Sequence, residues 1–310
     1  MRALAQCVSH SPLLKPDSLK DPRGPAVAAA LDSARDALAR FSPEVIVLFG
    51  PDHFHGFFND LMPPYCIGAQ ASGVGDWGTS TAALNVDSEH ACDLHEYLIN
   101  HGFDPAISHD MRVDHAFAQP LDFIAPSTTP VIPFFINCAA SPLPPISRVR
   151  ALGEAVGSYF RERSIRAAFI GSGGLSHDVG FPDVRKATGA DRARVLHRPE
   201  SSRPEERHAA EARIHGFVTK FVAGETHLAP LNEKWDREIL GLFEKGDFVS
   251  LEKMQDADIT RQGGAAAHEI RTWFAALGAL QAFGDYRIEE TFYASVPEWI
   301  VAFGALRAAV

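Results

Sequence analysis

The chain has few cysteines, and they form no recognisable pair. Its 310 residues contain four, which are scattered along the sequence with no C-x-x-C spacing: Cys7, Cys66, Cys92 and Cys138. This distribution argues against a disulfide framework and favours buried free thiols in a reducing cytoplasm.

The chain also lacks an excess of positive charge and any long apolar run. With 29 basic and 39 acidic residues, its net charge is −10, which argues against a nucleic-acid or anionic-membrane partner. An anionic small substrate would therefore need a local Arg, Lys or metal ion to attract it. No stretch approaches the roughly 18 apolar residues of a membrane-spanning helix, and "MRALAQCVSHSPLLK" does not have the architecture of a signal peptide. With 46% hydrophobic and 22% charged residues, we expect a globular cytoplasmic protein.

Apolar runs alternate with helical patterns along most of the chain. The continuous apolar runs predict strands covered on both faces, at 3–9, 44–50, 130–137 and 166–171. Periodic apolar spacing predicts helices at 25–41, 88–102 and 148–163, and then at 204–222, 232–246 and 264–283. This order predicts an α/β sandwich around a largely parallel or mixed sheet, with a helix-rich C-terminal half. We expect one domain over residues 1–310, with 180–204 as an exposed excursion.

Three of the predicted strands are each followed by a histidine. His10 comes after the first strand, His53 after "EVIVLFG", and His177 after "RAAFIG" in the turn "GSGGLSH". Ligands of open α/β sheets bind at the carboxyl ends of the strands. A single histidine after a strand is usually an ordinary surface side chain, but three at equivalent positions indicate a ligand site. We expect the glycines to let the backbone approach that ligand closely.

A fourth candidate lies in "MRVDHAFAQP", where Asp114 precedes His115 at the start of a predicted short helix. Taken alone, Asp114 is more simply explained as a helix cap. His55 stands two residues after His53, and in an extended loop it is expected to face elsewhere.

Two histidines and a carboxylate are the ligands of non-haem Fe(II) oxygenases, but histidine and carboxylate ligands also suit zinc. The residues alone select neither the metal nor the carboxylate among 39 acids. "HEIRT" begins like a zinc-protease helix but lacks the second histidine. "GSGGLSH" is not a G-x-S-x-G nucleophile turn, and it has no phosphate-loop lysine.

Longer stretches resemble the class III extradiol ring-cleavage dioxygenases from one end of the chain to the other. They are "CVSHSPLL", "FSPEVIVLFGPDHFHGFFNDLMPPYC", "VDHAFAQPL", "PVIPFFIN", "GSGGLSH", "HLAPLNEKWD", "AHEIRTW" and "VPEWIVAFG". The stretches "GFFNDLMPPYC" and "PEWI" narrow the resemblance to the branch that cleaves catechols bearing a phenylpropionate side chain. The sequence departs from the family mainly at 178–210 and in "KPDSLKDPRGP".

The resemblance implies a fold, a reaction and a set of residue roles. It implies an α/β sandwich that uses Fe(II) and O2 to open a catechol ring, in bacterial cytoplasmic degradation of aromatic acids. The implied substrates are 3-(2,3-dihydroxyphenyl)propionate and its cinnamate analogue, and the implied assembly is a homo-oligomer such as a tetramer. Carried onto this sequence, the metal ligands are His10, His53 and Glu269. The acid–base residues are His115 and His177, with Asp114 expected to stabilise a protonated His115.

Three alternatives stay open at this point. The protein could be an extradiol dioxygenase for another catechol. It could be a zinc hydrolase that uses the same ligands and an activated water. It could also be a metal-free binding module, because a fold does not fix a function.

Overall fold

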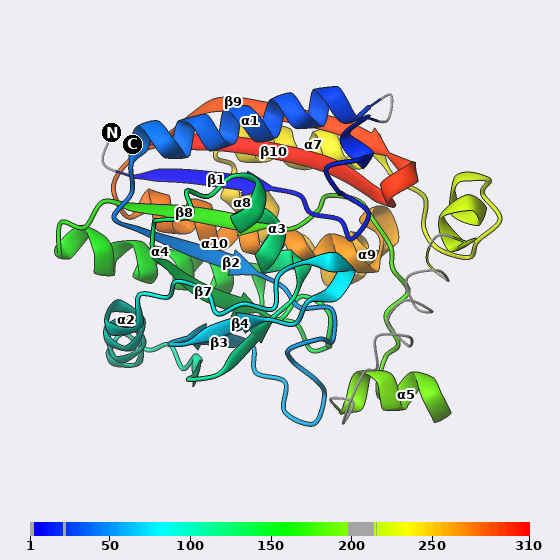
Figure 1. The fold of residues 1–310 in the computed structure, drawn as a ribbon, viewed down its shortest axis with the longest axis horizontal. Helices are drawn as coiled ribbons and strands as arrows, with labels where there is room; N and C mark the ends of the chain where they lie inside the picture. The colour runs from blue at the N-terminus through cyan, green and yellow to red at the C-terminus, as the bar shows by residue number, and fades with distance from the viewer. Residues whose placement is uncertain (1–2, 21–22, 198–213, 215) are drawn as a thin grey trace.

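The computed structural model describes residues 3–20, 23–197, 214 and 216–310, and these residues are arranged around an eight-stranded sheet (Figure 1). The strand order is β5-β3-β7-β2-β8-β1-β10-β9. The strands are β1 (Leu4–Val8), β2 (Val45–Gly50), β3 (Tyr65–Gly68), β5 (Ala106–Ser108), β7 (Val131–Ile136), β8 (Ala167–Ser172), β9 (Arg287–Val296) and β10 (Val301–Ala309). A separate parallel pair consists of β4 (Ala71–Gly73) and β6 (Met111–Val113).

The four predicted strands are confirmed, and they form the centre of the sheet. β7, β2, β8 and β1 lie side by side and parallel, and every residue in them is buried. Their apolar sequences agree with this position, because a central parallel strand is covered on both faces. Since the four strands run in one direction, their carboxyl ends meet at one edge of the sheet.

Helices cover both faces of the sheet, which confirms the predicted α/β sandwich. Alternate residues of β2 belong to different cores, because successive side chains of a strand point to opposite faces. Val47 packs in the core that includes α4 and α10, whereas Leu48 packs in the core that includes α1 and α3. These helices are α1 (Gly24–Phe41), α3 (His115–Phe123), α4 (Ile146–Glu162) and α10 (Ile270–Gln281).

Most of the other predicted helices are also present. The predicted helix 264–283 begins as a 3-10 turn, η3, and continues as α10. The helix predicted at 204–222 lies largely outside the described residues. The remaining helices are α2 (Ser88–Asn100), α5 (Gly189–Leu196), α7 (Glu233–Glu244), α8 (Phe248–Glu252) and α9 (Asp256–Gly263), with 3-10 turns η1 (Ser18–Lys20), η2 (Asp76–Gly78), η3 (Ala265–Glu269) and η4 (Pro297–Trp299).

Two long C-terminal strands, β9 and β10, were not predicted. β10 pairs antiparallel with β1, so that Leu4 lies opposite Ala309. Its sequence "VAFGALRAA" is rich in Ala, Leu and Arg, which favour helices in isolation, and pairing with β1 overrides that preference. The C-terminal half therefore combines the predicted helices with this antiparallel edge of the sheet.

The described part of the predicted excursion 180–204 is mostly exposed, as expected, but it is anchored at one point. Val195 of α5 is 1% exposed and packs against Phe54 and Phe58. The backbone N–H groups of Asn59 and Asp60 donate hydrogen bonds to the carbonyls of Val195 and Leu196. These contacts fasten the segment to the loop that follows β2.

All four cysteines are free thiols; three are buried and Cys92 is half-buried. Burial raises the pKa of the Cys66 thiol to about 12, which keeps this thiol protonated and unreactive. Among the described residues, no helix is both long and apolar enough to cross a lipid bilayer.

Candidate active site

Three histidines that follow central strands meet one buried glutamate at the carboxyl edge of the sheet. His10 follows β1, His53 follows β2, His177 follows β8, and Glu269 is the last residue of η3. Their Nε2 atoms lie 3.6, 3.2 and 3.5 Å, respectively, from an oxygen of the Glu269 carboxylate, whose side chain is only 3% exposed. Residues that are far apart in the sequence are thus brought to one point by adjacent parallel strands.

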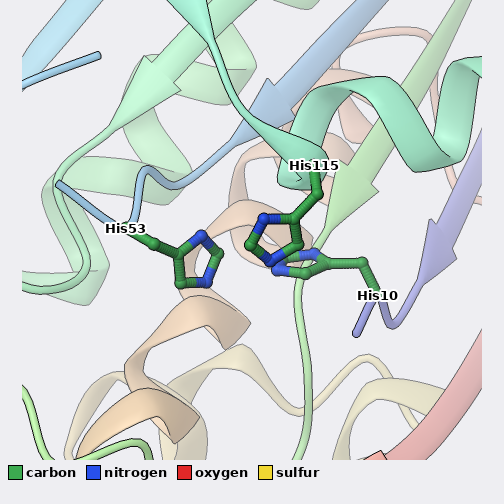
Figure 2. Close-up of side chains that lie close together, drawn as sticks. All are labelled: His10, His53 and His115. Atoms are coloured by element: carbon green, nitrogen blue, oxygen red, sulfur yellow. The ribbon is translucent and has the colours of Figure 1, made fainter. Parts of the chain in front are cut away.

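His115 joins this group from the first turn of α3. Its ring stacks on His53, with centroids 4.4 Å apart, and its centroid is 5.3 Å from that of His10. Figure 2 shows the three rings converging from different elements, and one nitrogen from each lies within 4.8 Å of the others. His10, His53, His115, His177 and Glu269 therefore form one cluster, which we call the central cluster.

A hydrogen-bond chain fixes the tautomer of His10. The hydroxyl of Ser172 donates to the carbonyl of Ala116, with 2.5 Å between the oxygens. Its oxygen must therefore accept from His10 Nδ1–H, at 2.9 Å. The unprotonated Nε2 of His10 is left facing Glu269, as a metal ligand requires.

His53 and His177 are held in the same way, through Nδ1. His53 Nδ1–H donates to Asp114 Oδ2 at 2.7 Å, and the backbone N–H of His53 donates to the same oxygen at 2.9 Å. His177 Nδ1–H donates to the carbonyl of Leu175 at 3.1 Å. In both residues, Nε2 faces the Glu269 carboxylate.

Asp114 is both the helix cap and the partner of a histidine. Its Oδ1 accepts from the N–H of Ala116 at 3.0 Å and caps α3. Its Oδ2 is occupied by His53 and lies 3.9 Å from His115 Nδ1. The short contact of His115 Nδ1, at 2.5 Å, is instead to Asp76, a residue that the sequence analysis did not select.

His55 also lies at the site, contrary to the expectation that it faces elsewhere. Its Nδ1 is 3.4 Å from Asp114 and 3.8 Å from Asp76. The loop does not stay extended, because Asp52 accepts from the backbone N–H groups of His55, Gly56 and Phe57 and so folds it into a turn. One sequence feature that could have drawn attention to Asp76 is its position in "GDWG", where two glycines bracket a buried acid.

Burial and neighbouring charges set the protonation of the central cluster. Burial lowers the pKa of His10 to about 3, so this imidazole stays neutral. Burial opposes protonation of His53 as well, but the carboxylates of Asp114 and Glu269 outweigh it and raise its pKa well above the usual range. Burial likewise opposes ionisation of Glu269, and the nearby His177 and His53 still hold its pKa well below the usual range.

The cluster fits a divalent metal ion. Nε2 of His10 and Nε2 of His115 are buried, and neither has a hydrogen-bond partner within the described part of the chain. A buried polar atom without a partner costs about 1–3 kcal/mol, so such atoms indicate a role that the protein alone does not satisfy. Imidazole nitrogens beside an ionised carboxylate, once a metal ion has displaced any proton on Nε2, are the donors that first-row divalent metals bind.

Two glycines of "GSGGLSH" are needed for packing within the protein. A Cβ on Gly173 would lie 2.7 Å from Glu269 Cβ, and one on Gly174 would lie 2.7 Å from the His177 ring. These glycines let the loop after β8 pack directly against η3 and fold His177 back over it. Close packing of the protein against itself already requires glycine at these two positions.

Phe181 lies beside His53 at the edge of the cluster. Its ring centroid is 5.8 Å from that of His53 and 5.5 Å from that of Phe54. The His53 side chain is 11% exposed, compared with 2% for His10 and 2% for His115. The approach to the cluster therefore lies on the His53 side, next to the segment that begins at Asp178.

Comparisons with known proteins show which family the chain belongs to. Residues 4–304 match the family described as "Catalytic LigB subunit of aromatic ring-opening dioxygenase". The chain is 41% identical, over 99% of its length and 99% of theirs, to the 2,3-dihydroxyphenylpropionate/2,3-dihydroxicinnamic acid 1,2-dioxygenases of Escherichia coli K12 and Shigella sonnei. An uncharacterized protein from Escherichia coli K12 aligns over 98% of both chains, with a TM-score of 0.49 and 14% identity. The chain therefore belongs to the LigB family of aromatic ring-opening dioxygenases, and it is an oxygenase enzyme.

Proposed function

We propose that this protein opens the ring of 3-(2,3-dihydroxyphenyl)propionate next to its hydroxyl groups, using O2 and a ferrous ion. We extend the proposal to the cinnamate analogue, because the curated relatives carry both substrates in their names. The observation that carries the proposal is the central cluster, in which Nε2 atoms of three histidines face one ionised carboxylate.

His10, His53 and Glu269 would hold the metal. Family membership implies a metal cofactor, and these three residues supply two imidazoles and a carboxylate, the donor set of non-haem iron oxygenases. Bound Fe(II) would supply open coordination positions and the redox chemistry through which O2 reacts with a catechol. His115 offers a further nitrogen close to those of His10 and His53, and the family resemblance assigns it, like His177, to acid–base chemistry and not to the ligand set.

His177 would remove a proton from the catechol. Its Nδ1–H is held by the Leu175 carbonyl, so the lone pair of Nε2 faces the centre of the cluster. The Glu269 carboxylate outweighs burial and raises the pKa of His177, which makes this imidazole a stronger base than an isolated one.

His115 would act as the proton donor. Its ring lies parallel to His53 and is 2% exposed, so a proton on Nε2 is kept from exchanging freely with water. It would protonate the oxygen that departs when the O–O bond breaks, and both oxygen atoms then remain in the opened product.

The remaining parts of the proposal concern the whole chain. We propose that residues 1–310 form one catalytic domain; the family match over 4–304 and the pairing of β1 with β10 support this. We also propose a cytoplasmic homo-oligomer such as a tetramer, which light scattering of the purified protein would test.

The direct test is O2 consumption by protein reconstituted anaerobically with Fe(II). Dihydroxyphenylpropionate should be consumed with one O2 per substrate and should give a yellow ring-fission product, while catechol and protocatechuate should react more slowly. Protein loaded with Zn(II) and the His53→Ala variant should consume no O2. Faster reaction of protocatechuate would assign another catechol, and full activity with zinc would refute iron.

A further inference from the structure

Asp76 lies in a short loop, but hydrogen bonds of its carboxylate hold it in the site. It begins η2 and is 6% exposed. Its Oδ2 accepts from His115 Nδ1–H at 2.5 Å and lies 3.3 Å from the backbone N of His115, while its Oδ1 accepts from the hydroxyl of Thr79 at 3.1 Å. Oδ2 therefore has His115 as its hydrogen-bond partner, and the Nδ1 atom of His55 lies farther away, at 3.8 Å.

The turn that carries Asp76 is held in an unusual conformation. Trp77 has a φ of 54°, in the left-handed region that non-glycine residues seldom adopt, and Gly75 and Gly78 on either side also have positive φ. The carbonyl of Asp76 accepts from both the N–H and the hydroxyl of Thr79. Strain of this kind persists only where the surrounding contacts fix it, and it is concentrated at functional sites.

The hydrogen bond between Asp76 and His115 Nδ1 determines which nitrogen of His115 can exchange a proton with substrate. Because a carboxylate accepts only from a protonated nitrogen, Asp76 keeps the proton on Nδ1. Nε2 of His115 is then the atom that gains or loses a proton, and it is buried without a partner among the described side chains. Asp114 does not supply this restraint, because it lies 3.9 Å away and its Oδ2 is held by His53.

We propose that Asp76 is a positioning residue that fixes the Nδ1–H tautomer and the ring plane of His115, so that proton transfer to substrate runs through Nε2. The proposal rests on the proposed role of His115 as proton donor. When His115 releases the Nε2 proton, the tautomer that remains is the one that Asp76 stabilises.

The first experiment observes the tautomer and requires neither iron nor turnover. Metal-free protein labelled with ¹⁵N-histidine is studied by long-range ¹H–¹⁵N correlation at a pH where His115 is neutral, with the His115→Ala spectrum for assignment. Wild type should show His115 protonated at Nδ1. Asp76→Asn should populate the Nε2–H form, because the new amide can donate to Nδ1. An Nε2–H form in wild type would overturn the proposal, whether or not the variant folds.

The second experiment measures turnover of the iron-loaded enzyme. Asp76→Asn should lower kcat by about 10–100-fold, with iron content and KM little changed. Asp110→Asn, an exposed acid just before β6, is the matched control and should behave as wild type. In the His115→Ala background, Asp76→Asn should add no further loss; an additive loss would mean that Asp76 acts through something other than His115.

The two experiments separate failure of this inference from failure of the proposed function. If His115→Ala keeps full turnover, His115 is not the proton donor, yet the tautomer measurement still reports whether Asp76 holds its ring. If His115→Ala is inactive and Asp76→Asn changes neither tautomer nor kcat, the positioning role of Asp76 is wrong.

Discussion

At the scale of single residues, the two proposed histidine ligands differ in the group that accepts the hydrogen bond from Nδ1–H. This difference should make them unequal as donors to a metal ion. His10 donates to a neutral hydroxyl, Ser172, whereas His53 donates to the carboxylate of Asp114. A carboxylate partner raises the basicity of the imidazole, so His53 should be the stronger donor to a metal and also the ligand for which protons compete hardest. The opposite pKa shifts of the two imidazoles, downward for His10 and upward for His53, agree with this difference.

Alanine at each proposed ligand should remove iron and activity together. His10→Ala, His53→Ala and Glu269→Ala should each fold but retain far less than one iron per chain, because two ligands rarely hold Fe(II) through purification. Iron is measured by elemental analysis beside circular dichroism. His101→Ala, at the exposed end of α2, should keep its iron. Stoichiometric iron in His53→Ala would refute the ligand set.

Alanine variants of the two proposed acid–base histidines should differ in the pH dependence of their activity. His115→Ala and His177→Ala should both keep iron and lose about 10²–10⁴-fold in kcat. Without His177 the catechol must lose its proton unaided, so activity should partly recover as pH rises. Without His115 the proton donor is absent, and higher pH should not help.

The pH profile of wild type provides the reference for these variants. Its acid limb should follow protonation of the base and its alkaline limb deprotonation of the acid, which together give a bell. A His177→Ala profile parallel to that of wild type would show that His177 does not abstract the proton, and loss of iron from either variant would make that histidine a ligand.

At the scale of elements, the loop after β8 and the turn η3 are packed so closely that each determines the position of the other. Gly173 lies against the side chain and carbonyl of Glu269, and Thr272 donates its hydroxyl hydrogen bond to the carbonyl of Ser172, 2.9 Å away. Glu269, a proposed metal ligand on a 3-10 turn, is thereby fixed by a neighbouring strand end.

Gly173→Ala should weaken iron binding without touching a ligand. The added Cβ would lie 2.8 Å from the Glu269 carbonyl oxygen, so η3 must shift. Overpacking of this kind costs about 1–3 kcal/mol, measured by denaturant unfolding, and the iron titration should shift to higher concentration. Gly241→Ala, which meets open space within α7, should instead be neutral or stabilising. Unchanged iron affinity in Gly173→Ala would contradict the packing argument.

Phe181 should contribute to binding of the aromatic substrate. Phe181→Ala removes the ring beside His53 and should raise KM about 2–10-fold, the range of one aromatic contact, with a smaller effect on kcat. Val179→Ala on the same segment changes an exposed side chain and serves as the control. If kcat falls and KM does not, Phe181 affects the chemistry and not the binding.

The sequence predicted the central parallel strands and the positions of the histidines after them, because continuous apolar runs and strand ends are local patterns. The family resemblance was needed to select Glu269, since η3 reaches the site through tertiary packing against the loop after β8, which no local sequence pattern shows. Asp76 and His55 were missed because loop folding, through Asp52 and the strained turn at Trp77, brings them in. β10 was missed because its partner β1 lies at the opposite end of the chain.

At the scale of the whole molecule, the net charge of −10 should oppose an anionic substrate. Because salt screens this repulsion, kcat/KM for dihydroxyphenylpropionate should rise between about 10 and 150 mM ionic strength, where the Debye length shortens from about 30 to 8 Å. Uncharged 3-methylcatechol should show no such rise. A fall for the propionate substrate would instead reveal a local cation that steers its carboxylate.

The pairing of β1 with β10 has a consequence for how the enzyme is made. β1, which leads to His10, lies between β8 and β10, and Glu269 also comes late in the chain. A ribosome that adds about 5–20 residues per second works for tens of seconds between His10 and Glu269. Throughout that interval the nascent chain holds its histidines without their carboxylate. If Glu269 is a ligand as proposed, the complete metal site forms only after Glu269 has been synthesised, so the metal supply acts on a nearly finished chain.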